Sequence, residues 1–328
     1  MKKMLSLAGL VVMSVLLYLA VFSVVHRPLV VGEIQRNLDF KLAYAKTLPS
    51  PKIVILAGSN GRYSHRCEML TQATGLPCVN ASIGVGIGLD FQLDQWRPLL
   101  KRGDVVYMPL EYSQYRFSFA EMHGGLQNAL MVHSQRDYLL SLDARRIAAA
   151  YGSFDLPFLI HGLGEMALER KGFWRRSSTE SLTPQGDEKG HTAEAGKAYE
   201  GFLLEATKGG NIGLSKVPDT SDTLTLLEPF LTQMRSDGVT VVGGLPTLPS
   251  SVNVDRADTE RLRSFYSGQG QQFLELANRS LYPLSCFFDT LSHLNEPCQV
   301  AHTAALGGAL AQLLASGASP KEGRGLGP

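Results

Sequence analysis

The sequence predicts an α/β domain with a parallel central sheet, preceded by one N-terminal transmembrane helix. Short continuous apolar runs recur along the chain, and such runs are typical of strands buried on both faces. Amphipathic stretches separate them, as in β-α-β units. The first 25 residues contain an uncharged apolar run, Met4–Val25. Of the 328 residues, 44% are hydrophobic and 19% charged, so the chain can bury a large core and is not disordered as a whole.

The apolar run Met4–Val25 is long enough, at about 1.5 Å per residue, to cross a hydrocarbon core of about 30 Å. A cleaved signal peptide is the alternative, but its apolar region is only about 7 to 15 residues long and ends in a small-residue cleavage site. The sequence Val-Phe-Ser-Val-Val-His at the end of this run has no such site. We therefore expect an uncleaved signal anchor, and Lys2 and Lys3 favour a cytoplasmic N-terminus.

The four cysteines form two local pairs, Cys67 with Cys78 and Cys286 with Cys298. An even number of cysteines in an exported chain is typical of disulfides, and we expect these two pairs to be bridged. Four unrelated buried thiols are the alternative. No Cys-x-x-Cys spacing indicates zinc. Two disulfides would place the domain outside the cytoplasm.

Between the anchor and the domain, residues 26–50 are expected to form a juxtamembrane connector. The domain itself is expected over 51–314, with an insertion at about 117–222 that shapes or covers the site and a disordered Gly- and Pro-rich tail at 315–328. Helices are expected within the insertion at 126–150 and 157–171. Strands are expected at 52–57, 77–79, 104–109, 239–242 and 282–288, and helices of the domain at 91–100, 223–236 and 258–278. In such sheets, ligands bind outside the carboxyl ends of the strands.

The first segment with chemical potential is Gly58-Ser59-Asn60-Gly61, directly after the first expected strand, with helix-forming sequence resuming near Tyr63. A serine on a strand-to-helix turn exposes its hydroxyl at the edge of the sheet, where nearby N–H groups stabilise an anion. An ordinary Gly-Ser-Asn turn is the alternative. No Gly-Lys-Ser/Thr follows, so the segment is not a P-loop.

The second segment runs from Asn80 to Gly88 and reads Asn-Ala-Ser-Ile-Gly-Val-Gly-Ile-Gly. Its glycines allow close approach of a substrate and provide N–H donors. It lacks the final spacing and the acidic residue of a dinucleotide fingerprint, which argues against nucleotide binding.

The third segment is Phe288–Asn295, where Asp289 stands four residues before His293. An aspartate at this distance can orient the imidazole while the histidine reaches a nucleophile on a neighbouring loop. The alternative is a polar loop in which His293 caps a helix. His302 is a rival base, and the remaining histidines, among them His191, lack such a setting.

Together these segments resemble the SGNH (GDSL-like) hydrolase superfamily over residues 52–116 and 223–314. The resemblance implies a flavodoxin-like, three-layer fold in which Ser59 is the nucleophile, Gly84 or Gly86 belongs to the oxyanion hole together with Ser59, and Asp289 and His293 complete a triad.

Two departures from this family concern the site. Asp-Thr-Leu-Ser-His is one residue longer than the usual Asp-x-x-His, and the third block, Gly-x-Asn-Asp, is missing. Asn60, Asn80 and Gln114 are alternatives for the missing oxyanion donor. The side chains expected to contact substrate are Asn60, Glu111, Tyr112, Gln114 and Asn295.

The pattern is most similar to the membrane-anchored proteins of alginate and cellulose O-acetylation and to the teichoic acid D-alanyl transfer protein. This similarity implies a periplasmic acyltransferase, held in a bacterial inner membrane, that O-acetylates an exported polysaccharide through an acyl-serine. Its partners would be the polysaccharide acceptor, a membrane O-acyltransferase that delivers the acyl group, and an exopolysaccharide secretion complex. A carbohydrate acetyl esterase and a non-catalytic polysaccharide-binding subunit are the alternatives.

The proposed chemistry requires no cofactor or metal. The net charge of +1, from 31 basic and 30 acidic residues, argues against nucleic acid as a partner and is compatible with a neutral or weakly charged glycan.

Overall fold

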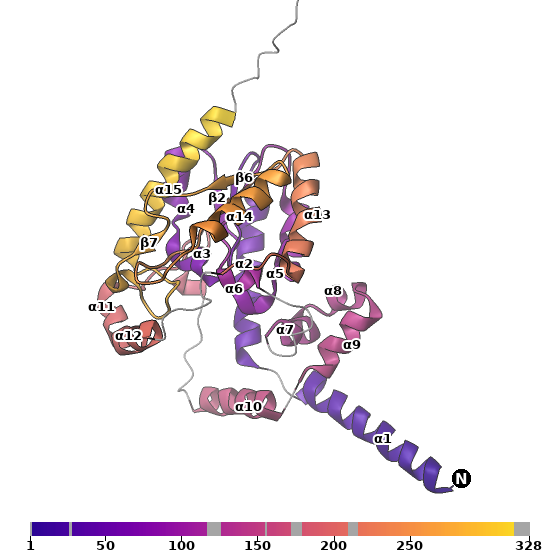
Figure 1. The fold of residues 1–328 in the computed structure, drawn as a ribbon. Coiled ribbons are helices and arrows are strands. Elements are labelled where there is room, and N and C mark those ends of the chain that lie inside the picture. Colours follow the sequence, from indigo (N-terminus) through magenta and orange to yellow (C-terminus); the bar gives the residue numbers. More distant parts are fainter. Residues whose placement is uncertain are drawn as a thin grey trace, which may run out of the picture.

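The computed structural model describes residues 2–25, 28–116, 126–154, 156–171, 179–208 and 216–317. It is an α/β structure with a five-stranded parallel sheet in the order β2-β1-β3-β4-β6, preceded by an apolar N-terminal helix (Figure 1). The strands of this sheet are β1 (Ile53–Ile55), β2 (Cys78–Asn80), β3 (Val105–Met108), β4 (Thr240–Gly244) and β6 (Gln272–Leu274).

The central strands are buried on both faces, as their continuous apolar sequences predict. In β1, Ile53 and Ile55 belong to the hydrophobic cluster on one face, and Val54 belongs to the cluster on the other. Helices therefore cover both faces of the sheet (Figure 1). One face is covered by α4 (Cys67–Thr74) and α15 (Glu296–Gly317), and the other by α5 (Leu89–Trp96), α13 (Asp222–Ser236) and α14 (Arg256–Gly268).

The fifth strand differs from the prediction. The expected helix at 258–278 ends in the structure with α14 at Gly268, and β6 follows beside β4. Gly270, with a φ of 69°, makes the turn between them. This edge strand has three residues, of which only Phe273 is buried. Its apolar pattern is therefore too short to be distinguished from that of an amphipathic helix.

The expected strand at 282–288 is also different in the structure. Only Leu281–Tyr282 (β7) is extended, and it pairs with β5 (Leu248–Pro249) in a separate two-stranded sheet. A short 3₁₀ turn, Leu284–Cys286, follows. The segment that carries Asp289 and His293 therefore follows a loop and not a strand of the central sheet.

The N-terminal region consists of α1 (Lys2–Ala20), a π-helical turn (Val21–Val25) and α2 (Leu29–Thr47). Within it, Ser6–Ser23 is long and apolar enough to cross a membrane, and 6% of that stretch is buried. The connector at 26–50 is thus largely the helix α2, which packs on the domain through Lys41 and Ala45; His26 and Arg27 lie outside the described residues.

The insertion is helical over most of its described residues. Its helices are α7 (Leu126–Ser134), α8 (Arg136–Ser141), α9 (Ala144–Gly152), α10 (Leu156–Arg170), α11 (Ala193–Gly196) and α12 (Glu200–Lys208). Residues 117–125, 155, 172–178 and 209–215 of the predicted insertion lie outside the described residues.

Both predicted disulfides are confirmed, Cys67–Cys78 and Cys286–Cys298. The first joins α4 to β2, and the second joins the turn after β7 to the start of α15. At the C-terminus, α15 continues to Gly317, three residues past the boundary expected at 314, because its apolar face still packs through Leu313 and Leu314. The rest of the predicted tail, 318–328, lies outside the described residues.

Candidate active site

The candidate site lies at the carboxyl edge of the sheet between β1 and β3. These strands are neighbours, and the chain leaves β1 toward β2 on one side before it returns to β3 on the other. Such a reversal of strand order opens a crevice at which α/β proteins bind ligands. Ser59 follows β1 and Glu111 follows β3, so both stand at this edge of the sheet, where the strand order reverses.

Ser59 is the first residue of the short helix α3 (Ser59–Ser64), which begins four residues earlier than the sequence predicts. The preceding residue, Gly58, has no room for a side chain. A Cβ there would lie 2.5 Å from Oε1 of Glu111 and 2.6 Å from Cγ1 of Val85. Gly61 is crowded in the same way, because its Cβ would lie 2.1 Å from Oγ of Ser82. The two glycines let α3 approach the ends of β2 and β3 closely.

Glu111 holds the serine turn. Its Oε1 accepts hydrogen bonds from Oγ of Ser59 (3.3 Å) and from the backbone N–H of Asn60 (3.2 Å). The Asn60 side chain donates to the carbonyl of Pro109 (2.8 Å), and Gln114 accepts from the N–H of Glu111 (3.0 Å). A carboxylate thus occupies the place of the missing third block. Nε2 of Gln114 and Oδ1 of Asn60 are buried and have no hydrogen-bond partner among the described residues.

Asp289 and His293 form the pair that their spacing predicts. Oδ1 of Asp289 lies 2.6 Å from Nδ1 of His293, and the opposite ring nitrogen, Nε2, is buried without a hydrogen-bond partner in the described part of the chain. The loop is held by the carbonyl of Ser292, which accepts from Oγ1 of Thr247 (2.9 Å). The extra residue between Asp289 and His293 therefore does not prevent their contact.

The His293 ring stacks on Tyr63, with ring centroids 4.0 Å apart and an interplanar angle of 8°. Tyr63 stands four residues after Ser59 in α3, and residues at this spacing share one face of a helix. His293 is thereby placed on the side of α3 that carries Ser59. No hydrogen bond joins Ser59 to His293 in the described structure, because the serine hydroxyl donates to Glu111.

The glycine-rich segment passes beside the serine turn, where Val85 packs against Gly58. Gly84 is extended, with a φ of −176°, and the space where its Cβ would stand is open. Gly86 lies against Leu126 of the insertion. No acceptor is found among the described residues for the backbone N–H of Ser59 or of Gly84.

Asn80, one of the expected oxyanion donors, is occupied by other contacts. Its amide nitrogen donates to the carbonyl of Gly61 and to Oδ1 of Asp187, both at 2.9 Å, and its Oδ1 accepts from the N–H of Ser82. It has no free donor and braces α3 against β2 and the insertion.

Tyr112 and Asn295, which were expected to contact substrate, instead make contacts within the protein. Tyr112, the first residue of α6 (Tyr112–Tyr115), is buried in the hydrophobic core, and burial raises the pKa of its hydroxyl. Asn295 donates to the carbonyl of Ser285 (2.9 Å) and accepts from the N–H of Cys298. It fixes the loop that carries Asp289 and His293.

His302, the rival base, belongs to a separate buried network. Its Nδ1 lies 2.9 Å from the Tyr282 hydroxyl and its Nε2 lies 3.3 Å from Nε2 of His65. Both ring nitrogens are occupied, and burial lowers the pKa of His302 well below its ordinary value.

His191 is brought to the site although its sequence setting does not indicate it. Its ring centroid lies 5.3 Å from that of Tyr63, and both of its ring nitrogens are buried without a hydrogen-bond partner among the described residues. Burial lowers its pKa to about 4, so the ring is neutral at pH 7 and has one donor and one acceptor nitrogen.

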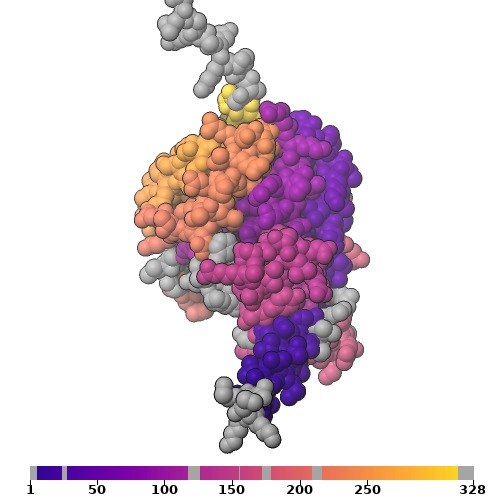
Figure 2. Space-filling view, turned by 90° about the vertical axis from the view of Figure 1, so that its right-hand side faces the viewer, coloured from indigo at the N-terminus to yellow at the C-terminus, as the bar shows by residue number. Residues whose placement is uncertain are grey.

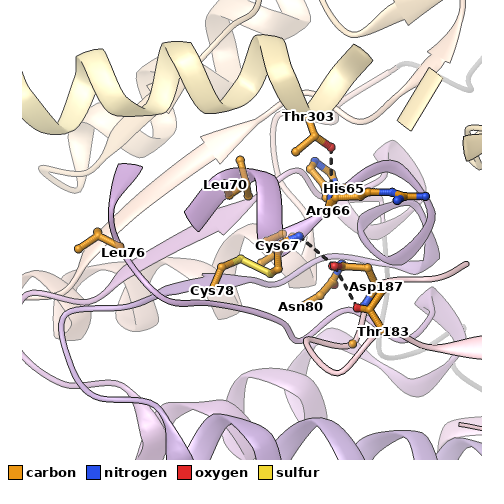
Figure 3. Close-up of a disulfide and its surroundings, with 12 residues drawn as sticks. His65, Arg66, Cys67, Leu70, Leu76, Cys78, Asn80, Thr183, Asp187 and Thr303 are labelled. Carbon is orange, nitrogen blue, oxygen red and sulfur yellow. Dashed lines mark hydrogen bonds between the residues drawn. A yellow bond between two sulfur atoms is a disulfide. The ribbon is translucent and has the colours of Figure 1, made fainter. Parts of the chain in front are cut away.

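The insertion reaches the site through charged contacts that precede His191. Glu188 pairs with Arg62 of α3, and Asp187 accepts from the N–H of Cys67 (2.9 Å) at the start of α4. Figure 3 shows Asp187 and Thr183 beside the Cys67–Cys78 disulfide, with Asn80, the last residue of β2, next to Asp187. These long-range contacts place His191, which explains why local sequence does not reveal it.

Among the described residues, no group of three or more His, Cys, Asp or Glu side chains has the arrangement of a metal site. In comparisons with known proteins, no protein-family model and no curated protein sequence matches the chain.

Proposed function

We propose that the protein is a membrane-anchored serine acyltransferase of the SGNH (GDSL-like) type, which O-acetylates an exported polysaccharide. The observation that carries the proposal is the hydrogen-bonded pair of Asp289 and His293, stacked through Tyr63 on the helix that begins with Ser59. A nucleophile, a base and a residue that orients the base are the elements of nucleophilic acyl transfer.

The fold supports this proposal. The order β2-β1-β3-β4-β6, all parallel, corresponds to the flavodoxin-like order 2-1-3-4-5 because β5 lies in the second sheet. Ser59 stands after the first strand and Asp289 and His293 stand near the end of the domain, as the resemblance implies.

In the proposed mechanism, Nε2 of His293 takes the proton of the Ser59 hydroxyl, and Oγ forms a bond with the acyl carbon. The N–H groups of Ser59 and Gly84 donate to the oxyanion. As the intermediate collapses, the bond to the leaving group breaks and His293 returns the proton to it, which leaves an acyl-serine. A sugar hydroxyl then gives its proton to His293 and attacks this ester. The bond between the acyl carbon and Oγ of Ser59 breaks, and His293 returns the proton to Oγ, which gives the acylated sugar and free Ser59.

One movement must precede this chemistry. The Ser59 hydroxyl, which donates to Glu111 in the structure, has to turn toward His293. Asp289 fixes the tautomer of His293 and stabilises the imidazolium that forms.

The exported location is supported by the two disulfides and by the apolar helix α1. Disulfides persist outside the cytoplasm, and an anchor holds the domain beside the membrane. We place the domain in the periplasm on a single-pass anchor in the inner membrane. The acyl group then comes from a membrane O-acyltransferase and the acceptor from an exopolysaccharide secretion complex.

The test uses the purified full chain in detergent with an activated acetyl ester, with and without an oligosaccharide acceptor. Acetylation of the peptide that contains Ser59, followed by appearance of acetylated oligosaccharide, is the expected result. Ser59→Ala should abolish both, whereas Ser113→Ala, which changes an exposed serine near the site, should change neither. Release of acetate without acetylated sugar would instead define a carbohydrate esterase. Sugar binding without acetylation of Ser59 would define a non-catalytic subunit.

A further inference from the structure

One face of α10 is apolar and uncovered. Its exposed side chains include Leu156 (64% exposed), Ile160 (60%) and Leu163 (45%), which stand at helical spacing on one stripe. Between 156 and 168, the exposed positions are Leu, Pro, Ile, His, Leu, Gly, Ala and Leu, without a carboxylate, lysine or arginine. Arg170 and Lys171 follow at the end of the helix.

The opposite face of α10 is fixed to the N-terminal helices. Oε2 of Glu165 accepts from the backbone N–H of Leu29 (3.0 Å), the first residue of α2. Phe158 stacks on Phe154, which stacks in turn on Phe22, with 5.5 Å between centroids in each pair. The Tyr18 hydroxyl donates to the carbonyl of Phe154 (2.9 Å). The position of α10 is therefore set by the last turns of the apolar helix.

These contacts define the depth of α10 relative to a membrane. The apolar stretch ends at Ser23, so Phe22 and Tyr18 lie only about 2 and 8 Å before its end along the helix axis. Helices that lie in a membrane surface bury their apolar face about 5 to 10 Å into the boundary between headgroups and acyl chains. Tyrosine and other aromatic residues gather at the same depth.

We propose that α10 lies in the surface of the bilayer that α1 crosses, with the stripe Leu156, Ile160 and Leu163 in contact with lipid acyl chains. This inference rests on the proposed anchoring of α1. Lipid is the favoured occupant because α10 is held through Phe154 at the last turns of the apolar helix, of whose spanning stretch only 6% is buried. Arg170 and Lys171 suit the headgroup region, where basic side chains extend toward phosphate. Figure 1 shows α10 and α1 at the same end of the molecule, below the sheet, and Figure 2 shows α1 emerging beneath the helices of the insertion.

With α10 in the membrane surface, the domain is attached at two elements and not at one. A single spanning helix allows the domain to rotate about the helix axis, whereas a second, lateral contact fixes its orientation. The crevice at Ser59 then keeps a constant direction relative to the membrane.

The experiment measures membrane depth in the full chain, reconstituted in phosphatidylcholine and phosphatidylglycerol vesicles. No free cysteine is found in the described part of the chain, so a single introduced cysteine accepts an environment-sensitive fluorophore selectively. Ile160→Cys and Leu163→Cys report on α10, Leu16→Cys reports on the anchor, and Ser264→Cys, on the exposed surface of α14, is the control. Nitroxide attached to lipid acyl chains serves as the quencher.

We expect quenching at positions 160, 163 and 16 to exceed quenching at 264 at least threefold. Quenching at 160 and 163 no greater than at 264, with strong quenching at 16, would overturn the inference and leave the anchor intact. Weak quenching at position 16 as well would overturn the anchor and the inference together. A fluorophore at 160 that is shielded from water but not quenched by lipid would identify a protein partner instead, which also contradicts the proposal.

Discussion

The carboxylate of Glu111 lies beside the hydroxyl of Ser59, with 3.3 Å between Oε1 and Oγ. The same oxygen accepts from the N–H of Asn60, so it holds both the Ser59 hydroxyl, which is the proposed nucleophile, and the turn that presents it. A negative charge in this place disfavours the oxyanion that forms during acyl transfer, because like charges repel in a partly buried crevice. The proposed mechanism assigns the base to His293, and Glu111 is the alternative because its carboxylate already accepts the serine hydroxyl.

Glu111→Gln distinguishes these two bases. The amide keeps an acceptor oxygen for Ser59 and Asn60 but removes the charge, so we expect the rate of Ser59 acylation to rise about threefold to tenfold if His293 is the base. The measurement is the pre-steady-state burst with an activated acetyl ester. A rate that falls at least a hundredfold would identify Glu111 as the base and contradict the proposed mechanism.

Asp289→Asn tests the orienting role of the aspartate. The amide cannot stabilise an imidazolium and favours the wrong tautomer of His293, so we expect kcat to fall by about three orders of magnitude. His293→Ala should lower kcat at least as far. The control is His161→Ala, which changes an exposed histidine of α10. Activity retained in Asp289→Asn would show that the pair is structural.

Lys41→Met tests the attachment of α2 to the domain. Nζ of Lys41 donates to the carbonyls of Asn80 (2.9 Å), Ser82 (2.7 Å) and Gly186 (2.6 Å) in a fully buried position. The substitution leaves these acceptors without a donor, so we expect the free energy of unfolding to fall by about 3 to 5 kcal/mol. Urea unfolding in detergent measures the change. Lys46→Met, at an exposed position of the same helix, should change it by less than about 0.5 kcal/mol.

The buried pair of His65 and His302 predicts loss of stability in acid. Nδ1–H of His65 donates to the Gly61 carbonyl, so its Nε2 accepts from Nε2–H of His302, and a proton added to His65 would place two N–H groups face to face. Burial lowers the pKa of His65 from 6.5 to about 4.

The folded protein consequently binds fewer protons than the unfolded chain between pH 6.5 and 4, and its stability decreases as the pH falls through this window. At pH 5 the expected loss is about 2 kcal/mol from His65, and the lowered pKa of His302 acts in the same direction. Unfolding midpoints between pH 7 and pH 4.5 measure it. The variant His65→Gln/His302→Gln should have a weaker pH dependence, whereas His161→Gln should behave like the parent. An unchanged pH dependence in the double variant would refute this account.

The features that sequence predicts well are those set by local pattern. The strands β1 to β4 are continuous apolar runs, the N-terminal helix has no charge from Met4 to Val25, and the disulfides join cysteines close in sequence. The contact of Asp289 with His293 is local as well.

The features that sequence does not predict depend on contacts between distant segments. Asn80 is polar and follows a strand, as a site residue would, but Asp187 and Gly61 take its amide hydrogens. His191 stands in an unremarkable polar stretch and reaches the site only because the insertion packs on α3 and α4. The partners of Asn80 and the contacts that place His191 lie far away in the sequence, so a local pattern does not reveal them.

The Cys286–Cys298 disulfide determines when the loop of Asp289 and His293 is covalently closed. It closes the short loop that contains both Asp289 and His293, so the proposed base and the residue that orients it are held in one covalent loop only after oxidation. In the cytoplasm, where thiols stay reduced, a newly made chain lacks this frame. If the proposed function is correct, the chain becomes fully active only after export and oxidation. Acyl esters in the cytoplasm are then exposed only to the reduced chain, in which the loop of Asp289 and His293 is not closed by the disulfide.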